Sequence, residues 1–318
     1  MLYKQRGKPK MLIGLQALEK RMSQSHEKYE YIQSELYKTR AGYGGELEYD
    51  RYMKEVRTDY PHAILHDLYL QHEGVYFQID SLFITPDTLI ISEVKNIADK
   101  IMITENPIQF IKQSIDGKRK VFRSPITEVE RKIHFLRKWL QLRKVESEVK
   151  GLIAFAHNNE IIIEAQPKIP IMTTYEAPAY FRSLVPSEKG MDQKGIMKLA
   201  QDLATAHRDF IPIPLLTRYR VEKHEIRGGV FCVKCEFAAV MKWKSLRWEC
   251  TTCGTRELHS HETTINEWFM LMPEHLTNRG FCEFTGLTNR HTAKRMLARS
   301  NTQKRGRGRG IKYSPLSR

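Results

Sequence analysis

Two apolar runs stand close together in the first third of the chain. Residues 77–84 and 88–94 are rich in Ile, Leu, Phe and Val, and the short stretch Thr85-Pro86-Asp87-Thr88 separates them. Runs of β-branched and aromatic residues that flank a Pro-Asp pair are typical of two strands joined by a turn. The pattern therefore predicts a β-hairpin, in which Pro86 and Asp87 form the loop and Thr85 pairs with Thr88.

Polar residues in this hairpin are predicted to share one face. With that register, Asp80 lies opposite Glu93 and Gln78 lies opposite Lys95, and side chains alternate between faces along a strand. The other face is predicted to carry the core residues Phe77, Ile79, Phe83, Ile90 and Val94. Two carboxylates one strand apart, roughly 4.5–5.5 Å between Cβ atoms, suit Mg²⁺, which prefers oxygen ligands and polarises phosphate. The alternative is a surface hairpin with one Glu–Lys ion pair.

Helical and strand patterns alternate around the hairpin. Residues 15–40 contain neither Gly nor Pro and predict a long helix, and a second helix is predicted to begin at 44–45. Apolar residues at helical spacing predict an amphipathic helix after the hairpin; they are Val129, Ile133, Leu136 and Leu140. Further strands are predicted at Gly151–Ala156 and Glu160–Ile163. This alternation predicts an α/β fold with a mixed sheet flanked by helices.

The hairpin sequence resembles a known family. FQIDSLFI followed by IISEVKN resembles the NERD (nuclease-related) domain of the PD-(D/E)xK restriction-endonuclease-like superfamily. The resemblance extends upstream to Gly42-Tyr43-Gly44-Gly45-Glu46, similar to the family's GxxGE opening, and downstream to Ser124-Pro125. It covers about Ala41 to Leu142, with a closing strand near Gly151–Ala156.

The resemblance implies a metal-dependent nuclease with a restriction-endonuclease-like core. Its catalytic residues would be Glu46, Asp80, Glu93 and Lys95. Asp80 and Glu93 would hold Mg²⁺ or Mn²⁺, and Lys95 would orient or deprotonate the attacking water. Glu46 has an alternative role as an acid at a helix start, where the helix dipole favours a carboxylate. The chain departs from the family at Ser124, where Asn is usual, and at Glu128, where Gln is usual.

Positive charge is concentrated at the end of the chain. The net charge is +15, and ten of the Lys and Arg residues lie between Thr285 and Arg318, where Asp and Glu are absent. Such a block favours a polyanion, and nucleic acid fits better than a membrane because no amphipathic apolar stripe accompanies the charge. A solvated tail without a partner is the alternative. The N-terminus lacks the apolar core of a signal peptide, so we expect a cytoplasmic protein.

Four cysteines predict a zinc site. Cys232-x₂-Cys235 and Cys250-x₂-Cys253 are separated by fourteen residues, close to the spacing of four-Cys zinc sites. Disulfide or redox chemistry is the alternative, which a reducing cytosol disfavours. Because four thiolates fill a tetrahedral site, the zinc would be structural.

The segment after the cysteines resembles a helix-turn-helix. Its first helix would be His275–Phe284, and its recognition helix Thr288–Ser300 would begin with Thr288 as N-cap and bury Ala293, Met296 and Leu297. The residues expected to bind nucleic acid are Arg290, Lys294 and Arg295 in this helix and Lys304, Arg305, Arg307 and Arg309 in a flexible arm beyond it. A basic helical hairpin for protein contacts is the alternative.

Together these patterns predict six segments. They are an N-terminal helical segment (1–40), the nuclease-like α/β domain (41–210), a linker (211–229), a zinc ribbon (230–260), a helix-turn-helix-like domain (261–300) and a basic flexible tail (301–318). The predicted function is a metal-dependent nuclease that acts on DNA, the helix-turn-helix favouring duplex DNA over RNA. A DNA-binding regulator or scaffold with an inactive nuclease-like core is the rival, and an RNA-processing factor is a third reading.

Overall fold

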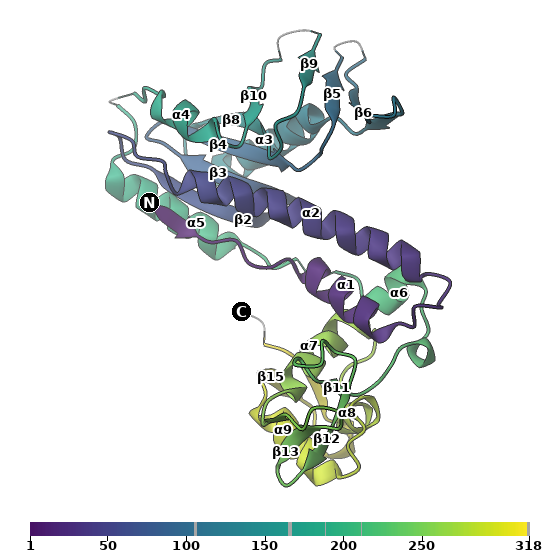
Figure 1. Ribbon diagram of the computed structural model, residues 1–318. Helices are drawn as coiled ribbons and strands as arrows, with labels where there is room; N and C mark the ends of the chain where they lie inside the picture. The colour runs from purple at the N-terminus through teal and green to yellow at the C-terminus, as the bar shows by residue number, and fades with distance from the viewer. Residues whose placement is uncertain (105–106, 165–166, 188, 211, 317–318) are drawn as a thin grey trace. The chain divides into compact units, whose positions relative to one another are not determined.

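A computed structural model of the chain describes residues 1–104, 107–164, 167–187, 189–210 and 212–316, with the side chain of Arg309 outside the description. The chain divides into two compact units. The first unit combines Met1–Gly7 with Arg40–Phe210, and the second combines Lys8–Thr39 with Ile211–Arg318 (Figure 1). The six segments predicted from the sequence are a finer division than these two units.

The first unit is built on a mixed six-stranded sheet. Its strand order is β1 (Leu2–Lys4), β2 (Ala63–His72), β3 (Val75–Ile84), β4 (Thr88–Lys95), β8 (Glu148–Phe155) and β10 (Ile171–Thr173). The pairs β2–β3 and β3–β4 are antiparallel, whereas β1–β2, β4–β8 and β8–β10 are parallel. The expected mixed α/β architecture is therefore present.

Helices cover both faces of this sheet. On one face, α3 (Pro125–Gln141) and α5 (Gln193–Ala206) pack against alternate residues of β4 such as Leu89 and Ile91. On the other face, α2 (Tyr29–Met53) and α4 (Ala177–Arg182) pack against the intervening residue Ile90. The alternation of buried side chains along β4 explains the unbroken apolar run Leu89–Ile91, because both faces of the strand are covered there.

The first unit also contains a second sheet, which lies beside α3. It has the order β7 (Arg119–Phe122), β6 (Phe110–Gln113), β5 (Lys100–Ile103) and β9 (Ile161–Ile163). Ile101 and Phe110 pack in one cluster with Val129 of α3 and Phe155 of β8. We call this sheet the accessory sheet. Among the strands of the accessory sheet, the sequence pattern predicted β9 alone.

Residues 15–40 form two helices rather than the one predicted. Helix α1 (Lys10–Arg21) ends at Met22, whose backbone is extended and forms a bridge with Ile226. A turn follows, in which the amide of His26 donates to the carbonyl of Ser23. Helix α2 then runs without interruption through the position where a second helix was predicted to begin.

The second unit combines α1 with the last third of the chain. Its other elements are α6 (Leu215–Tyr219), a 3₁₀ turn η1 (Lys223–Glu225), a sheet of β11 (Val230–Phe231), β12 (Val240–Lys244), β13 (Arg247–Cys250) and β14 (Arg256–Glu257), then α7 (His261–Leu271), α8 (Asn278–Thr285), α9 (Arg290–Arg299), β15 (Thr302–Arg305), η2 (Gly308–Gly310) and β16 (Lys312–Pro315).

Arg21 joins α1 to this assembly. Its guanidinium is fully buried, donates to Glu267 and lies over the rings of Phe231 and Phe284.

Two strands lie within the basic tail that the sequence predicted to be flexible. Strands β15 and β16 pair antiparallel as a hairpin. The hairpin is anchored because Tyr313 is buried and its amide donates to the carbonyl of Leu276. Among the described helices, none is long and apolar enough to cross a membrane.

Candidate active site and four-cysteine cluster

The β3–β4 hairpin has the predicted register. Ser81 pairs with Ser92 and Ile84 pairs with Leu89, and the amide of Thr85 closes the turn on the carbonyl of Thr88. The register thus directs Asp80 toward Glu93, and both carboxyl groups are buried. The amide of Val94 donates to Asp80 Oδ2 over 2.9 Å, which fixes the orientation of that carboxylate.

The prediction that five apolar residues share one face of the hairpin is wrong in part. Phe77 and Ile79 pack on the α3–α5 side of the sheet, whereas Phe83 packs on the α2 side. The alternation of side chains between the two faces of β3 shifts by one residue between Ile79 and Phe83. This shift lies opposite Asp67, whose backbone has a left-handed φ of 54°. Gln78 is also displaced from the predicted cluster. Its side chain donates to Asp67.

Helix α3 completes the carboxylate cluster with two residues one turn apart. Lys95 Nζ lies 2.8 Å from Glu93 Oε1 and 2.7 Å from Glu128 Oε2. Lys132 Nζ donates to the second oxygen, Glu93 Oε2, and lies 3.9 Å from Asp80 Oδ1. The charges therefore alternate from Glu128 through Lys95, Glu93 and Lys132 to Asp80, a pattern that compensates buried charges.

Glu46 reaches this region through an arginine from the N-terminus. Arg6 Nη1 donates to Glu46 Oε2 over 2.8 Å, and the same guanidinium donates to Asp50 and to the backbone carbonyl of Asp80. Glu46 therefore adjoins the cluster but is paired with Arg6. It lies well inside α2, so the alternative role of an acid at a helix start does not apply.

The close packing of α2 explains why a glycine, Gly45, comes directly before Glu46. A Cβ atom at this position would lie 2.5 Å from Asn96 Cβ and 3.2 Å from Ala156 Cβ. Only glycine lets α2 approach the ends of β4 and β8 this closely. Asn96 then donates to the carbonyl of Ala41, which ties the helix to the strand that carries Glu93 and Lys95.

Burial and neighbouring charges shift the pKa values of this site. Burial, and then the charge of Asp80, raise the pKa of Glu46 to about 8, although Arg6 acts in the opposite direction. Burial and Glu93 also raise the pKa of Asp80. For Lys95, burial by itself lowers the pKa, but Glu93 and Glu128 raise it above its usual value. Lys132 is affected in the same way, with Asp80 and Glu93 raising its pKa. Both lysines therefore carry a positive charge at neutral pH.

The donor set suits a divalent cation that takes oxygen ligands. Asp80 and Glu93 supply two carboxylates, and a positive group, the ammonium of Lys132, already interacts with both. Mg²⁺ usually binds through one or two carboxylates and keeps several waters. Asp80 and Glu93 therefore fit such an ion, with Glu46 held apart by Arg6.

The four predicted cysteines come together. Their Sγ atoms all lie within 4.8 Å of one another. Cys232 Sγ lies 3.7 Å from Cys253 Sγ, and Cys235 Sγ lies 3.7 Å from Cys250 Sγ. A tetrahedral site with Zn–S bonds of about 2.3 Å requires an S–S separation of roughly 3.8 Å, whereas a disulfide requires about 2 Å. The geometry is compatible with a zinc ribbon, and among the described residues it is the one group of three or more His, Cys, Asp or Glu placed to hold a metal ion.

The basic residues predicted to bind nucleic acid are exposed. In α9, Arg290, Lys294 and Arg295 face solvent, while Ala293, Met296 and Leu297 are buried as predicted. The helix is capped by Asn289, which accepts from the amides of His291 and Thr292, and not by Thr288. In the hairpin, Lys304, Arg305 and Arg307 are exposed, and the Arg309 side chain lies outside the described part.

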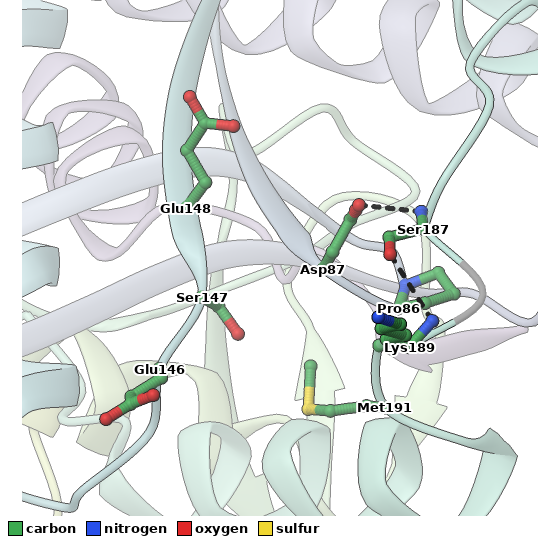
Figure 2. Close-up of a pocket in the computed structure, with 9 residues that line it drawn as sticks. Pro86, Asp87, Glu146, Ser147, Glu148, Ser187, Lys189 and Met191 are labelled. Atoms are coloured by element: carbon green, nitrogen blue, oxygen red, sulfur yellow. Dashed lines mark hydrogen bonds between the residues drawn. The ribbon is translucent and has the colours of Figure 1, made fainter.

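A cavity lies elsewhere in the first unit, away from Asp80 and Glu93. It has a volume of about 480 Å³ and is lined at the β3–β4 turn by Pro86 and Asp87 and by residues 146–148 and 187–191, apart from residue 188. Figure 2 shows Asp87 accepting a hydrogen bond from the amide of Ser187. Asp87, Glu146 and Glu148 make this wall acidic, which disfavours a phosphate-bearing substrate.

Sequence reasoning missed two positive residues of the site. Lys132 had a usable indication, because it lies beside Val129, Ile133 and Leu136 on the inward face of the predicted helix. Arg6 had none, since it lies 40 residues from Glu46 and 74 from Asp80 along the chain.

Two buried carboxylates on neighbouring strands of a mixed α/β unit can hold a divalent metal ion of the kind that polarises phosphate groups. Residues 41–156 match the model of the NERD family, the nuclease-related domain. Comparisons with curated proteins and with solved structures found no match. The matched region contains Glu46, Asp80, Glu93 and Lys95, whereas Arg6 and the four cysteines lie outside it.

Proposed function

We propose that the protein is a metal-dependent nuclease that hydrolyses phosphodiester bonds of DNA. The observation that carries the proposal is the buried pair Asp80–Glu93 with Lys95 on the same strand as Glu93, inside the region that matches the nuclease-related domain. Buried carboxylates are costly unless the protein uses or compensates them. A divalent ion such as Mg²⁺ or Mn²⁺, when bound by Asp80 and Glu93, would polarise the scissile phosphate.

Each residue of the site then has a distinct task. Asp80 is oriented by the amide of Val94, so its free oxygen can serve as a metal ligand. Lys95 is protonated at neutral pH because of Glu93 and Glu128. It is therefore suited to orient the water and neutralise developing negative charge, rather than to remove a proton. Glu46 supports the site through Arg6, which also holds the backbone of Asp80.

Positive surfaces for the substrate occur in both units. In the first unit, Lys118, Arg119 and Lys120 are exposed on the accessory sheet, which shares a hydrophobic cluster with α3. In the second unit, exposed basic residues lie on α9 and on the β15–β16 hairpin. We propose that α8 and α9 act as a helix-turn-helix on duplex DNA, that the hairpin binds phosphates, and that a structural zinc ion is bound by the four cysteines.

A second candidate function is a DNA-binding regulator or scaffold that does not cut. The observation that favours it is the charge balance of the site, because Lys95 and Lys132 already neutralise Glu93 and Asp80. The retention of Asp80, Glu93 and Lys95 together favours the enzyme, since loss of one of them would indicate an inactive core.

The deciding experiment incubates purified protein with plasmid, linear duplex, single-stranded DNA and RNA, with Mg²⁺, Mn²⁺ or EDTA. We expect metal-dependent cleavage of DNA. Asp80→Asn or Glu93→Gln should abolish cleavage and leave DNA binding nearly intact, and Lys95→Met should lose cleavage but retain metal binding. Asp87→Asn, at the β3–β4 turn, is the matched control. Equal cleavage by parent and Asp80→Asn protein would assign the activity to another site.

A further inference from the structure

Lys132 occupies a position that the proposed chemistry needs for a metal ion. Its ammonium donates to Glu93 Oε2 and lies 3.9 Å from Asp80 Oδ1. The side chain is largely buried, with 12% of its surface exposed. An ammonium in this place does for two buried carboxylates what a divalent cation does, because it neutralises their charge.

The placement of Lys132 follows from the packing of α3. Val129 and Leu136 of this helix are buried against the sheet. Lys132, one turn from each, is therefore directed toward β4. Glu128, one turn before Lys132, accepts from Lys95 and holds that second ammonium on the other side of Glu93. The helix thus places its own lysine on one side of Glu93 and the Lys95 partner on the other.

Both oxygens of Glu93 are engaged as a result. Oε1 accepts from Lys95 and Oε2 accepts from Lys132. A metal ion bound by Asp80 and Glu93 needs the oxygens that face Lys132, and two cations repel each other at such short range. The long, flexible stem of a lysine allows its ammonium to move away while the helix stays in place.

We propose that Lys132 is an internal cation that holds the metal position between Asp80 and Glu93 and is displaced when a divalent ion binds. This inference rests on the proposed metal site. It assigns Lys132 a regulatory role: the lysine competes with the metal, keeps the metal-free carboxylates compensated, and sets the concentration of divalent ion at which the site fills.

The test measures metal binding and not cleavage. Full-length, zinc-loaded protein is titrated with Ca²⁺ and with Mg²⁺, which prefer oxygen ligands and leave the thiolates alone. Calorimetry gives the dissociation constant, and thermal unfolding gives the stabilisation by the metal. Lys132→Met should bind the ion at least tenfold more tightly than the parent and should gain more thermal stability from it, because the competing charge is gone.

The controls separate this competition from a general loss of an ion pair. Lys112→Met removes an ion pair with Asp99 in the same unit, 2.9 Å long and away from Asp80 and Glu93, and should bind metal as the parent does. If Lys132→Met does not fold, Lys132→Gln keeps a donor to Glu93 without the charge and should still bind more tightly than the parent. Lys132→Arg keeps the charge and should not.

The outcomes distinguish the inference from the function it rests on. The competition is overturned if both neutral variants bind the metal with unchanged or weaker affinity, while the parent binds it and Asp80→Asn abolishes that binding. The proposed metal site then still stands. Absence of binding in the parent and in every variant overturns the metal site itself, and with it the proposed metal-dependent mechanism.

Discussion

The carboxylate cluster of the first unit and the cysteine cluster of the second unit each bring several polar side chains close together. They differ in how the residues are spaced along the chain and in what surrounds them. The four cysteines lie within 22 residues of chain, and their sulfurs approach one another to 3.7 Å. The carboxylates of Asp80 and Glu93 come from two strands and are surrounded by Lys95, Lys132 and Arg6, which lie far apart in the sequence.

The difference follows from the charge of the two ligand types. A thiol is neutral until it loses its proton, so four of them can converge before a metal binds. A carboxylate is charged at neutral pH, and burying two of them requires positive partners. We therefore expect the second unit to rely on a metal for stability at its cluster, whereas the first unit has compensation built into its fold. A metal ion should act as a structural component in one unit and as an exchangeable one in the other.

The largest effect should come from removing the metal of the cysteine cluster. Cys250→Ser should lose zinc and unfold the ribbon, because structural zinc sites contribute on the order of 10 kcal/mol of metal-coupled folding. Elemental analysis should find one zinc per chain in the parent, and a chelator should lower its thermal stability. Cys282→Ser, outside the cluster, is the matched control. A zinc-free preparation with unchanged thermal stability would remove the contrast between the two sites.

The sequence could predict the part of each site that depends on local spacing. The two CxxC pairs fix the cysteine cluster, and the Pro-Asp turn fixes the register that directs Asp80 toward Glu93. Both were confirmed by the geometry, as was the buried stripe of Ala293, Met296 and Leu297. In each case neighbouring residues along one strand, turn or helix determine the result.

The sequence could not predict what depends on long-range packing. Arg6 reaches Glu46 because β1 pairs with β2, and this pairing leaves no mark on residues 1–7. The accessory sheet was missed because β5 and β9 come from separate segments that pair only in the fold. The phase change near Asp67 moved Phe77 and Ile79 to the α3 side, which strict alternation cannot anticipate. The pairing of β15 with β16 within the predicted tail also depends on the fold, because Tyr313 is buried and its amide donates to the carbonyl of Leu276.

An intermediate effect should appear in the pH dependence of the first unit. The pKa of Glu46 rises from 4.5 to about 8 on folding, so between these values the folded state holds a proton that the unfolded state has released. Stability due to this group is full below pH 4.5 and falls as the pH rises toward 8. At about 1.36 kcal/mol per unit of pKa, the change amounts to a few kcal/mol.

Glu46→Gln removes this titration and should sharpen the comparison. Thermal unfolding at pH 5, 7 and 8.5 should show the variant gaining stability relative to the parent as the pH rises. Glu48→Gln is the control on the same helix, because Arg51 lowers the pKa of Glu48 and its removal should not reproduce that gain. If parent and Glu46→Gln respond equally to pH, the buried charges of the first unit are compensated more completely than we infer.

The smallest effect concerns the exposed charges of the second unit, where neither a metal nor a buried partner is involved. The β15–β16 hairpin is anchored by Tyr313, so substitutions on its surface are a cleaner test than truncation. Lys304→Gln with Arg305→Gln removes two exposed cations. If both contact phosphates of duplex DNA, the log–log salt slope of binding should flatten by roughly two units. Lys194→Gln with Lys198→Gln, exposed on α5 of the first unit, makes the same change in net charge and should leave the slope near that of the parent. Affinity is measured at several salt concentrations for the three proteins. Equal slopes in all three would mean that the hairpin does not contact the phosphates and that net charge accounts for the binding.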